Sequence, residues 1–185
     1  MSADSLELID LGFTAKLGLK GAGAADWLAA RQLPVPQEIY GATRLAHGGW
    51  IVKIGAAEYF VEPDDPAAIE HWLAQGPLPP GVYRAPREET ALLLQGDRTK
   101  LLALVAQTCA IEVAKAPPER IFYSRVAGVS CGILPATTSP ASFRLWVDPT
   151  YADYLWETLA AIVAELGGQA QRSPPRRVPT IVPAH

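Results

Sequence analysis

The chain has 185 residues, of which 49% are hydrophobic and 19% charged, a composition typical of a globular protein with a substantial core. Its net charge of -3 and isoelectric point near 5.6 argue against nucleic acid or an anionic membrane as partner, because binding phosphates requires surplus lysine and arginine. No apolar run reaches the ~20 residues of a membrane span and the acidic N-terminus is unlike a signal peptide, so we expect a cytoplasmic protein.

The first predicted unit is a strand, a glycine turn and a helix, in residues 17–31 with the sequence LGLKGAGAADWLAAR. Residues 6–20 alternate loosely between apolar and polar positions, which predicts one or two strands entering the turn. Gly21 and Gly23 form the turn, and the helix is expected from residue 24 to about residue 32. The small residues of this turn should let the helix approach the sheet closely.

Three strands and a second helix are expected after a proline-stiffened connector at residues 33–37. The predicted strands are Thr43–Ala46, Trp50–Ile54 and Glu58–Glu62. The helix is predicted at 63–75, with Asp64 or Asp65 as N-cap, Pro66 near the first turn, and Ile69, Trp72 and Leu73 facing inward. The proline- and glycine-rich segment 76–86 is the best boundary candidate in the chain.

The second half repeats this plan. Residues 92–106, LLLQGDRTKLLALVA, again predict a strand, a turn at Gly96 and a helix that continues to about Cys109. The strands that follow are expected at Phe122–Val126, Ser130–Leu134 and Phe143–Val147.

Two short stretches of the first half have counterparts in the second. Residues 43–46, TRLA, match residues 124–127, SRVA, and residues 59–63, YFVEP, match residues 145–149, LWVDP. The sequence therefore predicts an α+β fold built as a tandem β-α-β-β-α duplication. The first half would span residues 1–83 and the second 84–168, both parts of one domain packed around a shared interior.

The last helix is predicted at Tyr151–Leu166 and ends at a glycine pair. Its apolar arc covers roughly 200°, more than one core requires, so the helix either packs on two sides within its own domain or is shared with a partner. The tail, residues 169–185, contains four prolines and three arginines and should be extended or disordered. Such a tail is either solvated or docked on a neighbouring subunit through Val178, Ile181 and Val182.

The glycine turn of the first unit resembles a dinucleotide-binding loop only superficially. The G-x-G-x-x-G pattern that begins at Gly21 would need a glycine where Asp26 stands. A carboxylate at the N-terminus of a helix would also compete with the phosphate that this position attracts. We therefore interpret the turn as structural.

A G-x-S-x-G sequence occurs at residues 128–132, and Asp148 and His185 follow in the order found in α/β-hydrolases. A nucleophile elbow requires a helix directly after the serine, whereas residues 133–135 continue as a strand. The histidine is also the last residue of the tail. We expect no catalytic role for Ser130.

The remaining candidates for site chemistry are scattered. His47, His71 and His185 lack the spacing of metal ligands, and Cys109 and Cys131 are interpreted as free thiols. No carboxylate pair is placed for acid and base work, because Glu88-Glu89 falls in the boundary loop and Asp64-Asp65 serves as a cap. The sequence thus predicts no catalytic and no metal-binding residue, and it assigns no cofactor-binding residue.

Four segments together carry a family resemblance over roughly residues 6–168. They read GLKGAGAADWLAA, GGWIVKIGAAEYFVEP, LLLQGD with LLALVAQTCAIEVA, and SRVAGVSCGIL with FRLWVDPTYADYLWETL. In order and spacing they resemble the gamma subunit of heterotetrameric sarcosine oxidase. That subunit is similar to the folate-binding region of the glycine-cleavage T-protein (aminomethyltransferase) superfamily.

The resemblance implies a non-catalytic structural subunit within an oxidoreductase complex. That complex demethylates sarcosine oxidatively to glycine and passes the one-carbon unit to tetrahydrofolate. Its alpha-, beta- and delta-type subunits would be the partners of this chain and would hold FAD, FMN, NAD and the folate, with no cofactor bound by this chain alone. A related complex acting on another N-methyl amine would be indistinguishable from this sequence. A mean hydropathy of +0.11 and five tryptophans agree with a surface partly covered by partners.

Departures from the family indicate that folate chemistry is absent. Aminomethyltransferases carry a stretch resembling GGVIDD, whose aspartate serves the folate, but this chain has Gly48-Gly49-Trp50-Ile51-Val52-Lys53. The chain also lacks the C-terminal barrel of full-length relatives and the KGCYxGQ-like motif of the iron-sulfur maintenance proteins. Two alternatives stay open. One is a freestanding protein that holds a folate or pterin in a cleft near Trp50 or Trp146, and the other is an independent transferase.

Overall fold

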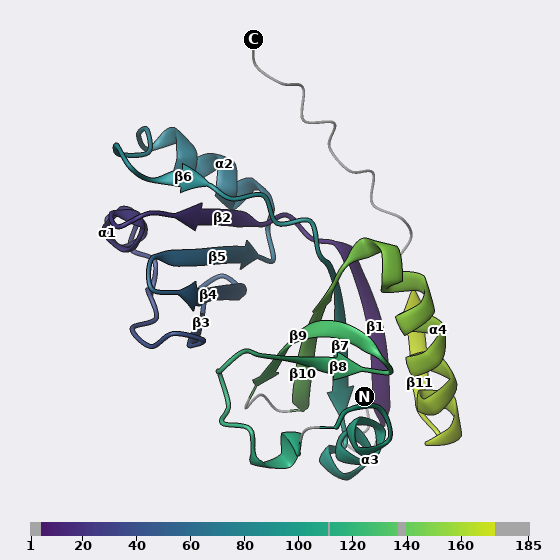
Figure 1. The fold of residues 1–185 in the computed structure, drawn as a ribbon. Coiled ribbons are helices and arrows are strands. Elements are labelled where there is room, and N and C mark those ends of the chain that lie inside the picture. Colours follow the sequence, from purple (N-terminus) through teal and green to yellow (C-terminus); the bar gives the residue numbers. More distant parts are fainter. Residues whose placement is uncertain (1–4, 111, 137–139, 173–185) are drawn as a thin grey trace.

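The computed structural model describes residues 5–110, 112–136 and 140–172, which form two antiparallel-rich sheets and four α-helices (Figure 1). The first sheet contains β2 (Leu17–Lys20), β3 (Ala42–Arg44), β4 (Gly49–Gly55), β5 (Glu58–Pro63) and β6 (Tyr83–Arg84). The second contains β1 (Leu6–Phe13), β7 (Thr90–Gly96), β8 (Phe122–Val126), β9 (Val129–Ala136), β10 (Ala141–Val147) and β11 (Gln169–Arg172). The helices are α1 (Ala24–Ala29), α2 (Ala67–Ala74), α3 (Arg98–Thr108) and α4 (Pro149–Glu165), with a 3-10 turn at Val113–Lys115.

The predicted α+β class and the duplication are confirmed. The elements β2-α1-β3-β4-β5-α2 recur as β7-α3-β8-β9-β10-α4, and the strand order β3-β4-β5-β2 in one sheet matches β8-β9-β10-β7 in the other. Each copy thus has three strands between its helices. That agrees with the strands predicted individually and is one more than the β-α-β-β-α formula contains.

Each copy also lends a strand to the sheet of the other. β1 precedes the first copy but pairs with β7, and β6 precedes the second copy but pairs with β2. Each sheet therefore contains residues from both sides of the boundary predicted between residues 83 and 84. The assignment of residues 1–83 and 84–168 to two halves stays a prediction, and the boundary segment itself contributes a strand.

The turn glycines are explained by this exchange. Gly21 and Gly96 have φ angles of +137° and +130°, which L side chains rarely adopt. A Cβ on Gly21 would lie 2.0 Å from the carbonyl oxygen of Gly81, and one on Gly96 would lie 1.8 Å from that of Ser5. The predicted close approach exists, but the atoms that approach each glycine belong to the backbone just before β6 or β1. The expectation that the helix makes it was wrong.

Three apolar clusters follow from the alternation of side chains along the strands. On β4, Ile51 faces the α1 and α2 side, whereas Trp50 and Val52 face the second sheet. The cluster between the sheets consists of Ala42, Trp50, Val52, Phe60, Ala91, Ile121, Leu134 and Trp146. Phe60 and Trp146 meet edge to face there, with ring centres 5.2 Å apart. The shared interior predicted for the two copies therefore exists.

The two helices of the first copy differ from their predicted bounds. α1 ends at Ala29, and Arg31 turns back to donate from Nε to the Trp72 carbonyl oxygen at 2.6 Å, which ties α1 to α2. α2 begins at Ala67 with Pro66 as N-cap, so neither predicted aspartate holds that position. Asp65 still accepts from the Ala67 backbone N at 3.0 Å. Because Pro66 lacks an N–H and has a fixed φ, it marks the helix start itself.

The last helix packs on several elements of its own domain, as the first of the two alternatives for its broad arc expects. α4 lies on β1, β7 and β11 and touches α3, and its buried residues are Leu155, Trp156, Leu159 and Val163 (Figure 1). The start of the predicted tail forms β11, which pairs in parallel with β1. Val178, Ile181 and Val182 lie outside the described residues. Within the part of the chain that the structure covers, no helix has the length and apolar character to cross a membrane.

Candidate functional site

A carboxylate is enclosed between the two sheets. Tyr59 and Val61 on β5 face the helices, so Phe60 and Glu62 face the second sheet. The side chain of Glu62 is 0% exposed. A charged group in such a place requires partners, because an isolated buried charge is strongly destabilising.

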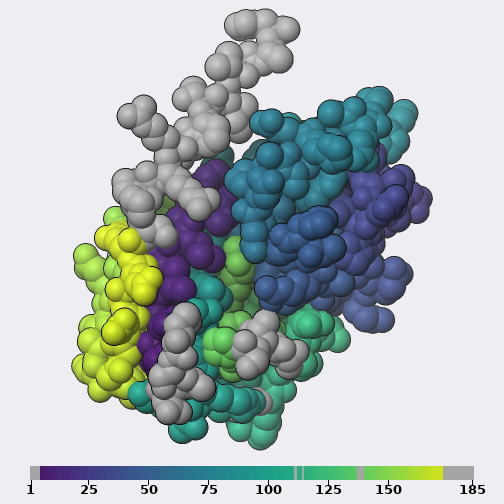
Figure 2. Space-filling view, turned by 180° about the vertical axis from the view of Figure 1, so that it is seen from behind, coloured from purple at the N-terminus to yellow at the C-terminus, as the bar shows by residue number. Residues whose placement is uncertain are grey.

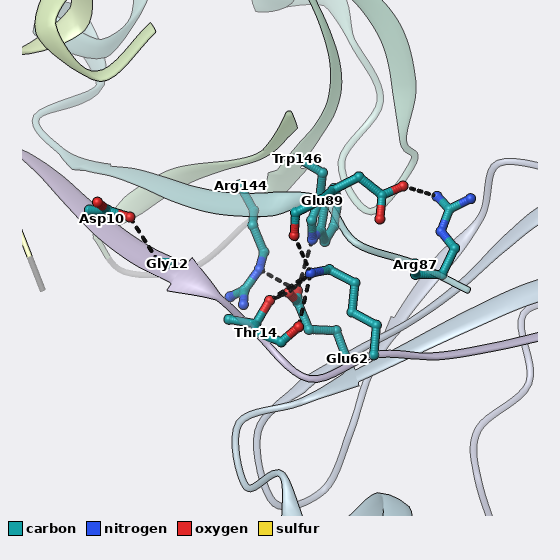
Figure 3. Close-up of polar contacts among 9 residues, drawn as sticks. Asp10, Gly12, Thr14, Glu62, Arg87, Glu89, Arg144 and Trp146 are labelled. Carbon is teal, nitrogen blue, oxygen red and sulfur yellow. Dashed lines mark hydrogen bonds and ion pairs between the residues drawn. The ribbon is translucent and has the colours of Figure 1, made fainter. Parts of the chain in front are cut away.

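Four side chains surround this carboxylate (Figure 3). Arg144 on β10 places Nε 2.7 Å from Oε2, and the indole Nε1 of Trp146 donates to the same oxygen at 3.0 Å. On the other oxygen, Thr14 donates its hydroxyl to Oε1, and Lys16 Nζ lies 3.4 Å away. Both carboxylate oxygens are therefore satisfied by groups from the β1–β2 connection and from β10.

Lys16 is itself enclosed, with its side chain 1% exposed. Its ammonium donates to the carbonyl oxygens of Glu89 at 2.6 Å and Thr14 at 3.1 Å, and to the Thr14 hydroxyl at 2.8 Å. These contacts hold the connection between β1 and β2 against the segment that leads into β7. The cluster of Thr14, Lys16, Glu62, Arg144 and Trp146, called here the buried ion cluster, thus joins the two copies.

Burial and charge act in opposite directions on the cluster. Burial alone would raise the pKa of Glu62, but Arg144, Lys16 and the Thr14 hydrogen bond outweigh it, so that pKa lies below its usual 4.5. Burial lowers the pKa of Lys16, partly offset by the negative charge of Glu62. A carboxylate that stays ionised and enclosed at neutral pH is a poor proton donor or acceptor for a substrate. Its geometry suits a structural joint.

A cavity of about 700 Å³ lies next to this cluster, between the sheets. Figure 2 shows blue residues of the first sheet beside green residues of the second. The lining residues come from both sheets and from the connections at the end of β1 and after β5: Leu11, Thr14, Ala15, Arg44, Gly49, Trp50, Pro63, Asp64, Pro66, Leu93, Gln95, Ala136, Pro140, Ser142 and Arg144. Thr14 and Arg144 belong to both the cavity wall and the buried ion cluster.

The cavity wall combines an indole with cations. The guanidinium of Arg44 lies over the ring of Trp50, 5.4 Å from its centre. Trp50 was one of the two tryptophans predicted to lie near a cleft, and it does line the cavity. Trp146, the other, is buried in the same inter-sheet cluster as Trp50 but is bonded to Glu62 and does not line the cavity.

The positions where aminomethyltransferases carry aspartates hold no carboxylate in this chain. Val52 is fully buried in the apolar cluster between the sheets. Lys53 donates from Nζ to the Gln37 carbonyl oxygen at 2.7 Å. The cavity wall does include the carboxylate of Asp64, which was expected to cap α2.

The structure does not assemble the motifs set aside from the sequence. Ser130 lies within β9, which continues without a following helix, and Asp148 accepts from the Thr150 backbone N at 2.8 Å as N-cap of α4. His47 and His71 are exposed, in a turn and on α2. Across the described residues, no group of histidine, cysteine and carboxylate side chains could hold a metal ion. His185 lies outside that range.

The two cysteines are buried free thiols, as predicted. Burial raises the pKa of Cys131 to about 12. A thiol with so high a pKa is almost entirely protonated at neutral pH and therefore unreactive as a nucleophile.

The buried ion cluster was not found by sequence reasoning, although a signal was present. In FRLWV, Arg144 lies on the same strand face as Trp146, and in YFVEP, Glu62 lies on the same face as Phe60. Each charged residue therefore shares a strand face with a large apolar one. Opposite charges on two such faces could have indicated a buried pair.

The comparisons with known proteins agree with this architecture. A chain of the heterotetrameric sarcosine oxidase from Corynebacterium sp. U-96, in complex with pyrrole 2-carboxylate, superposes with a TM-score of 0.67 at 19% identity, over 90% of each chain. Aminomethyltransferase T of the glycine cleavage system from Bartonella henselae superposes with a TM-score of 0.61 at 13% identity. That match covers 84% of this chain and 45% of the transferase.

The chain has the fold shared by these two proteins. The resemblance predicted from the sequence is therefore confirmed at the level of three-dimensional structure. No protein-family model matches the sequence, and a search of curated proteins finds no match. The evidence for the relationship thus lies in the fold.

Proposed function

We propose that this chain is a non-catalytic, gamma-like structural subunit of a heterotetrameric sarcosine-oxidase-type complex. One observation supports this role most strongly: the structural match spans 90% of the sarcosine oxidase chain as well as 90% of this one. The aminomethyltransferase match spans only 45% of that enzyme. Because this chain matches an oxidase chain in both length and fold, we infer that it has the same kind of role within a complex.

The interior of the chain supports a role without catalysis. The enclosed Glu62 carboxylate is bonded on both oxygens, and Val52 and Lys53 replace the carboxylates of the transferase pattern. Alpha-, beta- and delta-type subunits would then carry FAD, FMN, NAD and tetrahydrofolate. They would perform the demethylation of sarcosine to glycine in the cytoplasm, and this chain would bind no cofactor.

Exposed aromatic side chains offer contact surface for such partners. Tyr83, Tyr123, Tyr151 and Tyr154 are each more than half exposed. Tyrosine is enriched at protein interfaces, because it supplies large apolar area together with one polar group. These residues occupy β6, β8 and α4, so partners could contact more than one side of the chain.

Deletion of the gene for this chain in its source organism tests the role. We expect sarcosine-dependent dye reduction in cell extracts to be lost and to return when the chain is expressed again. The purified chain alone should reduce no dye with sarcosine. Wild-type oxidation in the deletion strain, or oxidation by the isolated chain, would contradict the proposal.

The cavity favours a second candidate function, a freestanding folate- or pterin-binding protein. Its volume of about 700 Å³ lies within the usual range for small-molecule sites, and Trp50 is one of its lining residues. Titration with tetrahydrofolate while tryptophan emission is recorded tests this candidate, with Trp50→Phe as the variant that should lose the signal. The absence of a saturable change up to millimolar ligand would exclude it.

A further inference from the structure

The subunit role assigns no ligand to this chain, yet the cavity has a specific chemical character. From its lining we infer that the cavity binds a small planar organic carboxylate between Arg44, Arg144 and the ring of Trp50. This inference goes beyond the proposed function and does not depend on it.

The charges around the cavity have a positive surplus. Arg44 and Arg144 line it together with one carboxylate, that of Asp64. Directly behind the wall, Lys16 pairs with Glu62. Three cationic groups thus stand against two anionic ones, in a chain whose overall net charge is -3. A concave site with surplus positive charge concentrates anions.

Arg144 is held in place before any ligand arrives. Its side chain is 11% exposed, and its Nε approaches Glu62 at 2.7 Å. A guanidinium carries five N–H donors in a planar fork, so a group anchored through Nε can bond a second carboxylate. Glu62 is therefore a positioning residue for Arg144. Pre-organisation of this kind reduces the entropy lost on binding.

The apolar part of the wall favours a flat organic group over a bare inorganic ion. The indole of Trp50 lines the cavity beside Leu11, Pro63 and Leu93, which are apolar. Trp50 is 5% exposed and the guanidinium of Arg44 lies over its ring, so a flat ligand would contact the accessible part of the indole while its carboxylate meets Arg44. An inorganic anion would leave this apolar surface without a partner.

The repeat supplies a matched control for Arg44. Arg125 on β8 is its counterpart in the SRVA stretch and is exposed, and it is not one of the residues lining the cavity. Arg44→Gln and Arg125→Gln therefore remove the same charge from equivalent edge strands. Only the first removes it from the proposed site.

Two probes of equal shape separate charge from stacking. Benzoate is a planar carboxylate, and benzamide has the same ring without the charge. Titration of the full ¹⁵N-labelled chain would follow the indole N–H resonance of Trp50, assigned with Trp50→Phe, and calorimetry would supply the affinity. We expect benzoate to shift this resonance saturably and to bind about tenfold or more tightly than benzamide.

The variants complete the test. Arg44→Gln and Arg144→Lys should each weaken benzoate binding about tenfold, while Arg125→Gln should leave it unchanged. Arg44 is exposed, so Arg44→Gln should not disturb the core. An amide spectrum that is otherwise unchanged would show that this variant keeps the fold. No saturable shift with benzoate, equal affinity for benzamide, or equal effects of Arg44→Gln and Arg125→Gln would each overturn the inference.

Discussion

The two copies of the repeat use equivalent carboxylates in different ways. YFVEP and LWVDP occupy the ends of β5 and β10, and they place Glu62 and Asp148 at corresponding positions. Asp148 is exposed and caps α4, which begins at the next residue, whereas Glu62 is enclosed by partners from the other copy. In the first copy the helix starts only at Ala67, so its strand-end carboxylate is not needed as a cap.

The backbone of the two copies differs much less than these side chains. Gly21 and Gly96 form the same positive-φ turn. Gly21 lies against the carbonyl oxygen of Gly81, which leads into β6, and Gly96 lies against that of Ser5, which leads into β1. The duplication thus repeats its architecture while one copy's strand-end carboxylate has become part of the joint between copies. This asymmetry is what places cationic groups beside the cavity.

The largest contrast is expected from the same change at the two equivalent carboxylates. Glu62→Gln keeps the shape but leaves Arg144 and Lys16 buried without their counter-charge, so the free energy of unfolding should fall by about 3 to 5 kcal/mol. Asp148→Asn should leave stability unchanged within error, because asparagine caps a helix as well as aspartate does. Urea denaturation of both variants measures the difference. Equal losses would show that Glu62 does not join the copies.

The stability contributed by Glu62 should depend on pH in a defined direction. Its folded pKa lies below the usual 4.5, so the contribution is complete above about pH 4.5 and is lost as pH falls through the folded pKa. The gap in unfolding free energy between wild type and Glu62→Gln should therefore shrink between neutral pH and about pH 3. Urea titrations across this range measure the gap. A gap that widens on acidification would contradict the direction of the pKa shift.

Alanine at the two turn glycines should give equal and substantial losses. Gly21→Ala and Gly96→Ala each combine a disfavoured φ with backbone overlap, which we expect to cost about 3 kcal/mol of unfolding free energy. Gly128→Ala is the control, because its φ is +83° with nothing within 4 Å of the added Cβ, and it should cost about 1 kcal/mol. Thermal and urea unfolding compare the three variants. A loss at Gly21 or Gly96 no larger than at Gly128 would refute the close approach.

The smallest effect is expected at the cap of α3. Asp97 accepts from the Lys100 backbone N at 2.9 Å, and Asp97→Ala should cost about 1 kcal/mol. Asp97→Asn keeps an acceptor and should cost much less. Circular dichroism during urea unfolding would detect the difference. An alanine variant as stable as the asparagine variant would remove the assigned role of this cap.

Local features of the fold could be predicted from the sequence because short-range patterns determine them. The turns at Gly21 and Gly96, the strands between the helices and the duplication all follow from glycine placement and apolar periodicity. The exchange of β1 and β6 could not be predicted in this way. A strand's own residues define its faces, but the neighbour with which it pairs depends on the whole fold.

The same limit applies to the site. The sequence offered Trp50 and Trp146 as residues near a cleft, and only Trp50 lines the cavity. Lys16, Glu62 and Arg144 are separated by 46 and 82 residues along the chain and meet only in the folded state. The start of α2 was missed because Asp64 and Asp65 both satisfy the cap pattern, whereas Pro66 is the N-cap and the helix begins at Ala67. The role of these charged residues therefore became clear only once the structure showed which of them form ion pairs.

Native purification from the source organism tests the proposed subunit role. The chain would be tagged at its chromosomal position and purified without denaturant, and its mass, visible spectrum and associated chains would be measured. We predict a stoichiometric assembly far larger than 19.8 kDa, with flavin absorption and larger partner subunits. Recovery of the chain alone, at its own mass and without flavin, would contradict it.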